Sequence, residues 1–386
     1  MALSADETAA PMEVEVALKM RNFAELQARV ARGEIIPREE MAAKYFPLAA
    51  DFEAMAAWLT AQGLTVTRDD TTRLSLVARG TVSQLKQAFQ VEFARITYQD
   101  AEYTSAITVP SLPAALAPSL IGINGLQPHL RPHKMARALV AQKASLSSPN
   151  SPPYLPREIL KAYSANTTGL TGAGQTIAIV IDTYPLASDL TTYWNNCGVT
   201  RAPNSSVQNI QVTGTPSPPN PASVDPTTGF PYGTEAVIDA ELTSSIAPGA
   251  NIRVYTTSDL SFPYLSLAYG QVYNELASQP GLHVLNLSFG IGESLTTFSQ
   301  RQSDATHFLA LASGGVTVFA SSGDGGSNPD PNTGDYSATA TLQPAHPASD
   351  PNVTGVGATT LIMDHSSGME SSETGWSLSV VGGGVT

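Results

Sequence analysis

The sequence predicts an α/β protein built from two parts, a small α+β domain followed by a parallel sheet with helices on both faces. Its 386 residues exceed the usual length of a single domain. The stretch Ser145–Pro153 is rich in serine and proline, as exposed linkers are. Beyond it, apolar strands alternate with helical segments, which is the pattern of a parallel sheet. We therefore divide the chain into residues 1–135, a linker and processing region at 136–153, and residues 154–386.

Composition excludes several classes of protein. The net charge of −13 argues against a nucleic-acid partner, because binding to phosphates depends on Lys and Arg. No apolar run reaches the ~20 residues of a membrane span, and residues 1–20 do not resemble a signal peptide. The one cysteine, Cys197, allows no internal disulfide and no Cys-rich metal site.

The charge is unevenly placed along the chain. Residues 1–150 hold equal numbers of acidic and basic side chains, so the whole net charge belongs to residues 151–386. In acid the carboxylates of the second part would be protonated, and its few Lys and Arg would keep positive self-repulsion small. The asymmetry suggests different working environments or a detachable first part, with chance composition as the simpler alternative.

The elements of the first part follow from hydrophobic spacing, capping residues and turn residues. We expect a strand at Met12–Met20, a helix capped by Asn22 and running to Gly33, a helix opened by Pro37, a helix at Asp51–Gln62, a hairpin of Leu64–Thr67 and Arg73–Ala78 around Asp69–Asp70, a helix at Ser83–Phe89 and a strand at Phe93–Tyr98.

The second part alternates strands and helices. We expect strands at Gln175–Ile181, Asn251–Tyr255, Val284–Phe289 and Val316–Ala320, with helices at Thr234–Ile246, Leu265–Ser278 and Thr297–Ser313. In such sheets the chemistry lies at the carboxyl ends of the strands. Asp182, Phe289 and Asp324 fall at or near those ends.

Two carboxylates on the first of these helices are candidates for acid–base chemistry. Glu235 and Asp239 are four residues apart, so they share one helix face. Paired carboxylates repel when both are ionised and therefore tend to share a proton, which suits a general base that works in acid. The alternative is an exposed acidic helix face, and the apolar flanks Val237, Ile238 and Leu242 argue against it.

A third carboxylate lies in a glycine turn. Asp324 belongs to the run Ser322–Ser327, directly after a predicted strand. If protonated, its carboxyl group could donate a hydrogen bond to a developing oxyanion. The alternative is an ordinary loop aspartate. The six histidines show no metal-ligand spacing, and we interpret them as surface or structural residues.

With these motifs the chain resembles the sedolisin family of serine-carboxyl peptidases, in a precursor form of the pro-kumamolisin type, from about Val14 onward. The first part is similar to the family's activation prodomain. Other stretches match family features in the expected order: Tyr154–Tyr163 the start of the mature domain, Gly233–Ala250 the catalytic helix, Val284–Gly290 the substrate-cleft strand, Ser322–Asp324 the oxyanion loop, and Gly382–Thr386 a glycine run.

The resemblance implies a subtilisin-like fold, incomplete at its C-terminal end, preceded by a ferredoxin-like α+β prodomain. It implies that Glu235 is the general base, that Asp239 orients it and shares its proton, and that Asp324 stabilises the oxyanion. It also places Asp182, Phe289 and Gly290 in the substrate cleft. Here Phe289 stands where many members have Trp, and Asp182 where some have Glu.

The family's nucleophile is the serine of a Gly-Thr-Ser run, and no such run occurs in these 386 residues. We therefore expect an incomplete sequence of an acid-acting endopeptidase precursor, inactive as given. The alternative is a non-catalytic protein that binds and inhibits a related peptidase. An ordinary subtilisin is excluded, because the sequence shows Tyr232–Glu235 where subtilisins need a His-Gly-Thr run.

The resemblance also implies partners and a location. We expect peptide or protein substrates, the protein's own prodomain as an intramolecular inhibitor, cleavage between about Ala136 and Pro153, and a monomer. Calcium is implied as a cofactor, with ligands beyond these residues and no metal site within them. The expected location is extracellular or another acidic compartment.

Overall fold

The structure is a computed structural model. It describes residues 3–68, 71–98, 101–134, 148, 152–225, 229–330, 337, 339–375, 379–380 and 383–384.

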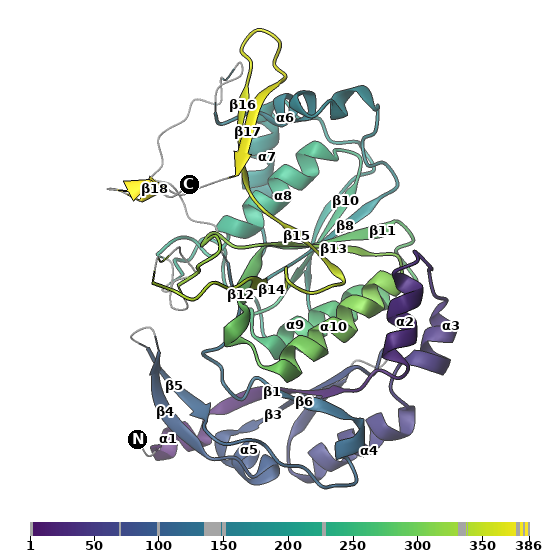
Figure 1. Ribbon diagram of the computed structural model, residues 1–386, viewed down its shortest axis with the longest axis vertical. Helices are drawn as coiled ribbons and strands as arrows, with labels where there is room; N and C mark the ends of the chain where they lie inside the picture. The colour runs from purple at the N-terminus through teal and green to yellow at the C-terminus, as the bar shows by residue number, and fades with distance from the viewer. Residues whose placement is uncertain are drawn as a thin grey trace.

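The first part is built on an antiparallel four-stranded sheet in the order β2-β3-β1-β6 (Figure 1). Its elements are α1 (Ala5–Ala9), β1 (Pro11–Leu18), α2 (Phe23–Val30), α3 (Arg38–Glu40) with a π-helical turn (Met41–Tyr45), α4 (Ala49–Ala61), β2 (Thr65–Arg68), β3 (Ser75–Thr81), α5 (Val82–Phe89), β4 (Phe93–Tyr98), β5 (Ala101–Ala106), β6 (Leu120–Asn124) and β7 (His133–Lys134). Strands β1 and β3 lie in the centre, and α4 and α5 supply the crossovers. This is the ferredoxin-like arrangement that was expected.

The predicted elements of the first part are confirmed within a few residues, with two differences. Asn22 precedes α2, but its side chain makes no cap; its amide donates to the carbonyl of Lys44, and its φ of 49° is left-handed. Helix α1 and strands β5, β6 and β7 were not predicted. The expected turn at Asp69–Asp70 lies outside the described residues.

The second part is a six-stranded, all-parallel sheet in the order β15-β13-β11-β8-β10-β9. Its elements are α6 (Pro156–Ala162), β8 (Thr176–Ile181), α7 (Ala187–Cys197), β9 (Val207–Gln211), α8 (Thr234–Ile246), β10 (Asn251–Thr256), α9 (Phe262–Glu275), β11 (Leu282–Leu287), β12 (Phe289–Gly292), α10 (Phe298–Ser313), β13 (Thr317–Ser321), β14 (Ala345–His346), β15 (Val353–Val356), β16 (Thr359–Met363), β17 (Glu370–Gly375), β18 (Ser379–Val380) and β19 (Gly383–Gly384).

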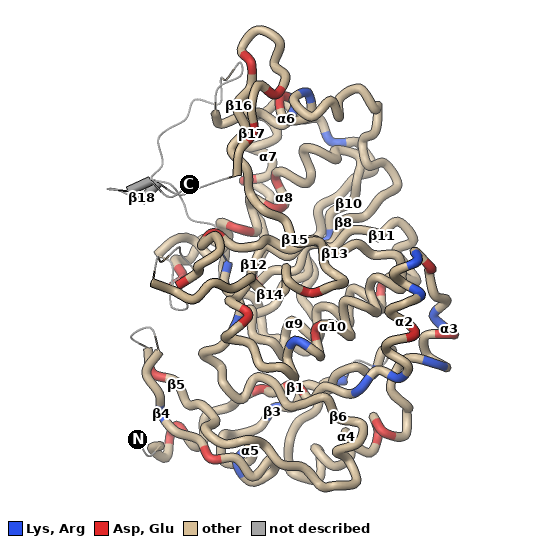
Figure 2. The backbone as a smooth tube through the Cα atoms, in the orientation of Figure 1, with Lys and Arg blue, Asp and Glu red and all other residues tan. Residues whose placement is uncertain are grey.

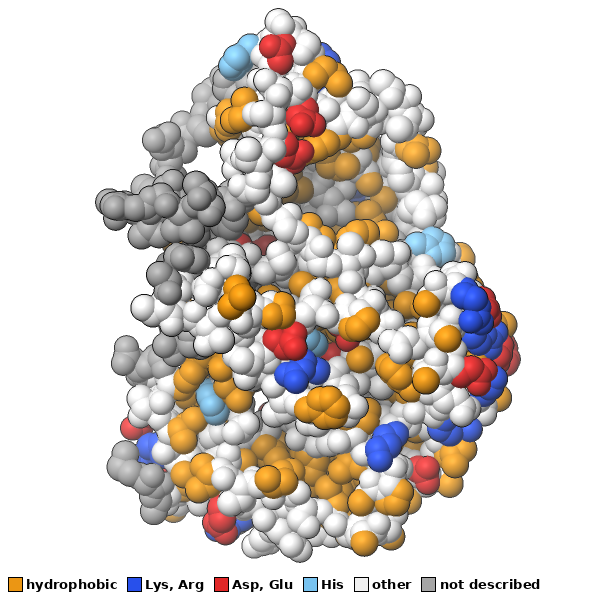
Figure 3. All heavy atoms as spheres, viewed as in Figure 1, with side chains coloured by type: hydrophobic (Ala, Val, Ile, Leu, Met, Phe, Trp, Pro, Cys, Tyr) orange, Lys and Arg blue, Asp and Glu red, His pale blue; other side chains and the backbone are white. Residues whose placement is uncertain are grey.

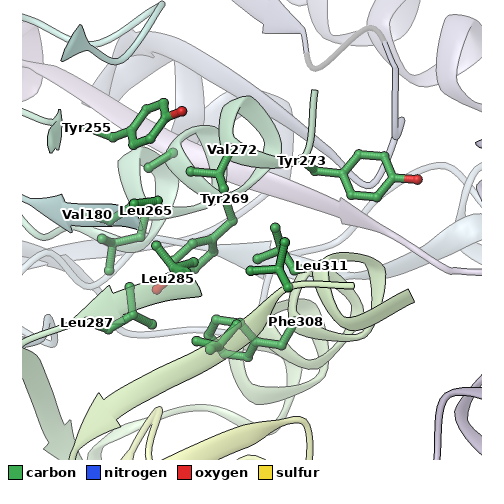
Figure 4. Close-up of a cluster of buried hydrophobic side chains, with 14 of the residues drawn as sticks. Val180, Tyr255, Leu265, Tyr269, Val272, Tyr273, Leu285, Leu287, Phe308 and Leu311 are labelled. Carbon is green, nitrogen blue, oxygen red and sulfur yellow. The ribbon is translucent and has the colours of Figure 1, made fainter. Parts of the chain in front are cut away.

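Helices α9 and α10 cover one face of this sheet, and α7 and α8 cover the other (Figure 1). Both faces are therefore apolar, as in Ala178–Ile181 of β8, where every residue is buried. Figure 4 shows how Tyr269 and Phe308 from the two helices meet Leu285 of β11, with the two rings 5.0 Å apart.

One predicted strand is divided. The expected strand Val284–Phe289 is broken at Ser288 into β11, which stays in the parallel sheet, and β12, which leaves it. Strand β12 pairs antiparallel with β7 on one side and β14 on the other. Because of this break, β12 is free of the parallel sheet and can pair with β7, a segment of the first part.

The first part packs against α9 and α10 through the face of its sheet that α4 and α5 leave open (Figure 1). Its residues Met41, Phe46 and Leu74 belong to the same buried cluster as the parallel sheet. The ring of Phe46 meets that of Tyr273 edge-on at 5.4 Å, and Arg38 donates to the Tyr273 carbonyl at 3.1 Å. The two parts thus share one apolar cluster at their interface, while the first part has a second core of its own.

The charge asymmetry is visible in the structure. Blue segments are frequent in the first part and sparse in the second (Figure 2). Charged side chains gather over α2 and α3 (Figure 3), where Arg29 bonds Glu34 at 2.7 Å and also Glu40. Ion pairs at the surface are screened by solvent and contribute little to stability. These ion pairs lie at the surface and do not determine the fold.

Candidate active site

The candidate residues meet at the carboxyl edge of the parallel sheet. Asp182 follows β8, Ser288 follows β11, and Asp324 lies in the turn after β13. These three strands are neighbours in the sheet, so the loops that follow them lie side by side. This is the edge at which open α/β sheets place their ligands.

Glu235 lies in the first turn of α8, directly after the N-cap Gly233. Its side chain is buried, with 8% of the residue exposed. The helix N-terminus carries a partial positive charge that favours an ionised carboxylate there. A Cβ on Gly233 would stand 2.7 Å from the Pro221 side chain, so glycine lets the 219–225 loop approach this end of α8.

Asp239 lies one helical turn after Glu235, as predicted, and is tied to the broken strand. The Ser288 hydroxyl donates to Asp239 Oδ1 at 2.7 Å and accepts from Asn286 at 3.0 Å. Within the described part of the chain, the other oxygen, Oδ2, is buried and has no hydrogen-bond partner. Burial raises the pKa of Asp239 to about 7, and the Ser288 and Asn286 contacts only partly offset this. The carboxyl group is therefore protonated throughout the acid range.

This raised pKa predicts a stability that falls as pH rises. The unfolded chain ionises Asp239 near pH 4 and the folded chain near pH 7, so folding becomes less favourable across that window. The change amounts to roughly 4 kcal/mol, at about 1.4 kcal/mol per pH unit. Asp239→Asn should remove it, and urea unfolding at pH 4 and pH 7 measures the difference. The exposed Asp6→Asn is the control; equal pH dependence in both variants would contradict the prediction.

Asp324 is partly exposed in the turn that follows β13. A small pocket is lined by its neighbours Ser322, Gly323 and Gly325 together with Gly290 of β12. The glycine turn that carries Asp324 and the strand β12 therefore meet at one pocket. His133 of β7 lines the same pocket.

The segment His133–Lys134 forms a two-residue strand beside the candidate cleft strand β12. It runs antiparallel to β12, with His133 opposite Gly290 and Lys134 opposite Phe289. The ring of Phe289 is fully buried in the core, so only its backbone borders this segment. Burial, reinforced by the nearby Arg131 charge, lowers the pKa of His133 to about 4. His133 therefore lines this pocket beside β12, a position that the sequence did not indicate.

Asp182 is buried and faces this segment rather than solvent. Its Oδ1 lies 3.0 Å from the Lys134 ammonium, and Asp225 Oδ2 lies 4.0 Å from the same nitrogen. Burial raises the pKa of Asp182, although Lys134 lowers it. Lys134 also donates to the carbonyl of Tyr232 at 3.0 Å, just before the catalytic-helix candidate.

Sequence reasoning missed four of these participants. Asn286 and Ser288 were quoted only as parts of a motif, Lys134 only as a linker cation, and Asp225 was not singled out. Lys134 offered one signal: it is one of four basic residues between Leu130 and Pro153, a stretch without acids. The partners of such a residue lie far away in sequence, so spacing alone does not reveal them.

Among the residues that the structure describes, no three His, Cys, Asp or Glu side chains lie together as a metal ion would require. The residues present therefore do not fit the calcium that the resemblance implies, and no step of the chemistry below involves it. None of the described helices has the length and apolarity of a membrane span.

The pro-kumamolisin activation domain matches residues 3–128. Kumamolisin from Bacillus sp. (strain MN-32) is 29% identical over 382 residues, covering 95% of this chain and 65% of that protein. Sedolisin from Pseudomonas sp. (strain 101) is 26% identical over 391 residues, covering 97% and 63%. Tripeptidyl-peptidase 1 from Canis lupus familiaris is 26% identical, covering 85% and 56%.

Among solved structures, Pseudomonas sedolisin, a serine-carboxyl proteinase complexed with two molecules of pseudo-iodotyrostatin, is 27% identical, with a TM-score of 0.48 over 58% of each chain. The chain spans less than two thirds of the length of the curated relatives named above. The activation-domain match and these relatives support a precursor of the sedolisin family of serine-carboxyl peptidases, to which this chain is similar over most of its length.

Proposed function

We propose that this chain belongs to the precursor of an endopeptidase that hydrolyses peptide bonds in acid. Glu235 is the general base, Asp239 orients it, and Asp324 stabilises the oxyanion. One observation carries the proposal: Asp239, one turn from Glu235, has its carboxyl group buried with a pKa raised to about 7. Titratable groups with strongly shifted pKa values beside a cleft are typical of catalytic sites.

The pair divides the acid–base work between its two members. Between pH 3 and 5 Asp239 keeps its proton, which it can share with Glu235 across one helical turn. Glu235, at the positive end of α8, is then the group that accepts the proton of an attacking hydroxyl. An ordinary carboxylate has a pKa near 4 and serves as a base in acid, where a histidine would be protonated and idle.

Asp324 plays the complementary role. A carboxyl group in a glycine turn reaches close to a bound carbonyl and, when protonated, donates a hydrogen bond to the oxygen that becomes negative in the tetrahedral intermediate. This donation requires acid, as does the proton held by Asp239. Both requirements favour the same pH range.

The mechanism needs a serine nucleophile, and the family's Gly-Thr-Ser run is not among these residues. The prodomain is proposed to inhibit from within, because β7 fills the cleft beside β12. Removal would follow a cut in the 136–153 region, most of which lies outside the described residues. The mature enzyme would act as a monomer outside the cell or in another acidic compartment.

The test is a peptidase assay of the protein expressed from its complete reading frame, between pH 2 and 8. We expect activity on peptides below about pH 5, appearing only after the prodomain is cut within 136–153, as terminal sequencing would show. Activity confined to neutral pH would contradict the roles of all three carboxylates. A reading frame that stops at Thr386, with inhibition of a related peptidase, would instead establish the binding alternative.

A further inference from the structure

The pocket around Lys134 is built for a cation. Its ammonium lies 3.0 Å from Asp182 Oδ1, 4.0 Å from Asp225 Oδ2 and 3.0 Å from the Tyr232 carbonyl. It also lies 5.0 Å from the centre of the Tyr232 ring, a cation–π distance. The three charged side chains are each about one tenth exposed. Two carboxylates, a carbonyl and an aromatic face therefore surround one positive charge.

The backbone holds Lys134 in the manner of a bound peptide. Strand β7 contains only two residues, and it adds to the edge of β12 by antiparallel pairing. In this mode of recognition the main-chain pairing is independent of sequence, and side-chain pockets provide the selectivity. The side chain opposite Phe289 is the one that enters the Asp182–Asp225 pocket.

While Asp182 and Asp225 are ionised, the electrostatics of this site favour an occupant with positive charge. Buried carboxylates are costly unless they are paired, and removing one partner of a buried ion pair is strongly unfavourable. If Lys134 leaves, Asp182 and Asp225 face each other across the emptied position, and each charge opposes the other. A neutral or acidic side chain in the same place would not relieve this.

We propose that Asp182 and Asp225 form a substrate subsite that selects lysine or arginine at the peptide residue aligned with Phe289. This rests on the proposed function, since it assumes that substrates pair with β12 as β7 does. Because the proposed cut lies beyond Lys134, the selected residue is on the N-terminal side of the scissile bond. An arginine would fit as well as lysine, since its guanidinium can bond both carboxylates and stack on Tyr232.

The preference of this site for a positively charged side chain can first be measured in the intact chain, where no peptidase activity is needed. At pH 7 the backbone amides of the 131–134 segment should exchange fastest in Lys134→Glu and more slowly in Lys134→Met. They should exchange slowest, and at equal rates, in wild type and Lys134→Arg. We expect at least tenfold faster exchange for Lys134→Met than for wild type. The control is Lys86→Gln, which removes an exposed ion pair with Glu92 and should change nothing in this segment.

Protection of β8 and β11 in the same experiment shows that each variant is folded. Equal exchange of the segment in Lys134→Met and wild type would overturn the proposal. Asp182→Asn combined with Asp225→Asn should match Lys134→Met. If that double variant does not fold, the exchange rates of the Lys134 variants still test whether the site selects a positively charged side chain.

The second measurement uses peptides that differ only at the selected position, with Lys, Arg, norleucine or Glu, and the acid-processed protein from the complete reading frame. We expect kcat/KM to be at least tenfold higher for Lys and Arg than for norleucine. In Asp182→Asn/Asp225→Asn that ratio should fall below about twofold while the norleucine peptide is still cleaved. An unchanged ratio overturns the subsite. If no peptide is cleaved by any variant, the proposed function fails, and the exchange series separately decides whether the pocket selects a cation.

Discussion

Replacing Glu235 with glutamine is expected to lower kcat/KM at pH 4 by about 10²–10⁴-fold, the usual contribution of a general base. The amide keeps the shape of the side chain but cannot accept a proton from an attacking hydroxyl. The loss should fall on kcat, because Glu235 acts on the reacting atoms rather than on distant parts of the substrate. The measurement is steady-state kinetics on the acid-processed protein from the complete reading frame.

Helix α8 supplies a matched control for this change. Glu241 lies on the same helix and is also partly buried, and burial together with Asp189 raises its pKa to about 7. It lies six residues after Glu235, so it points away from the Glu235–Asp239 face. Glu241→Gln should leave kcat within about twofold of wild type. If Glu235→Gln kept more than a third of the wild-type kcat, Glu235 would not be the general base.

The candidate catalytic helix was predictable because the residue pattern that favours a helix at this place agrees with the way the helix packs in the fold. Helix α8 spans Thr234–Ile246, as predicted from the sequence. The glycine before it permits close approach of the 219–225 loop, and small residues such as Ala236 and Ala240 bury its inner face. Glu235 and Asp239 then share a face for purely geometric reasons.

The cleft segment could not be predicted in the same way. A two-residue strand such as β7 has no periodicity, and its partner β12 is more than 150 residues away. The ion pair of Lys134 with Asp182 depends on that pairing. The break at Ser288 was hidden for a similar reason: the run Val284–Phe289 is apolar enough to be one strand, and only the tertiary contact of Ser288 with Asp239 shows why it ends.

The buried carboxylate of Glu15 is expected to be the strongest single contact between the first part and the helices beneath it. Glu15 lies on β1 and is completely buried. Its Oε1 accepts from Ser266 of α9 at 2.6 Å and from Ser303 of α10 at 2.7 Å, and its Oε2 accepts from Asn124 at 2.8 Å. His307 Nε2 lies 3.9 Å from Glu15 Oε1, too far for a hydrogen bond.

Glu15→Ala should therefore destabilise the folded chain by about 3–5 kcal/mol at pH 7, the range for breaking a buried charged network. The variant leaves the serine hydroxyls and the Asn124 amide without their acceptor in a dry interface, and each such loss is costly. Urea unfolding measures the change. The control is Glu53→Ala, which breaks an exposed ion pair with Arg68 and should cost no more than about 1 kcal/mol. Similar losses in the two variants would show that the network does not hold the interface.

The same carboxylate should make the interface sensitive to acid. Burial raises the pKa of Glu15, but His307, Ser266 and Asn124 outweigh it, so the pKa lies below the ordinary value. A depressed pKa gives stability that is present above the unfolded pKa and is lost as pH falls through the folded one. The destabilisation measured for Glu15→Gln relative to wild type should therefore shrink below about pH 4. His133 should add to this sensitivity, because burial lowers its pKa to about 4 in the folded chain. Once the 131–134 segment is released, His133 takes up a proton below about pH 6.5, so acid favours the released state. Acid would thus weaken the hold of the first part at two separate contacts, in the same pH range in which Glu235 and Asp324 are proposed to work.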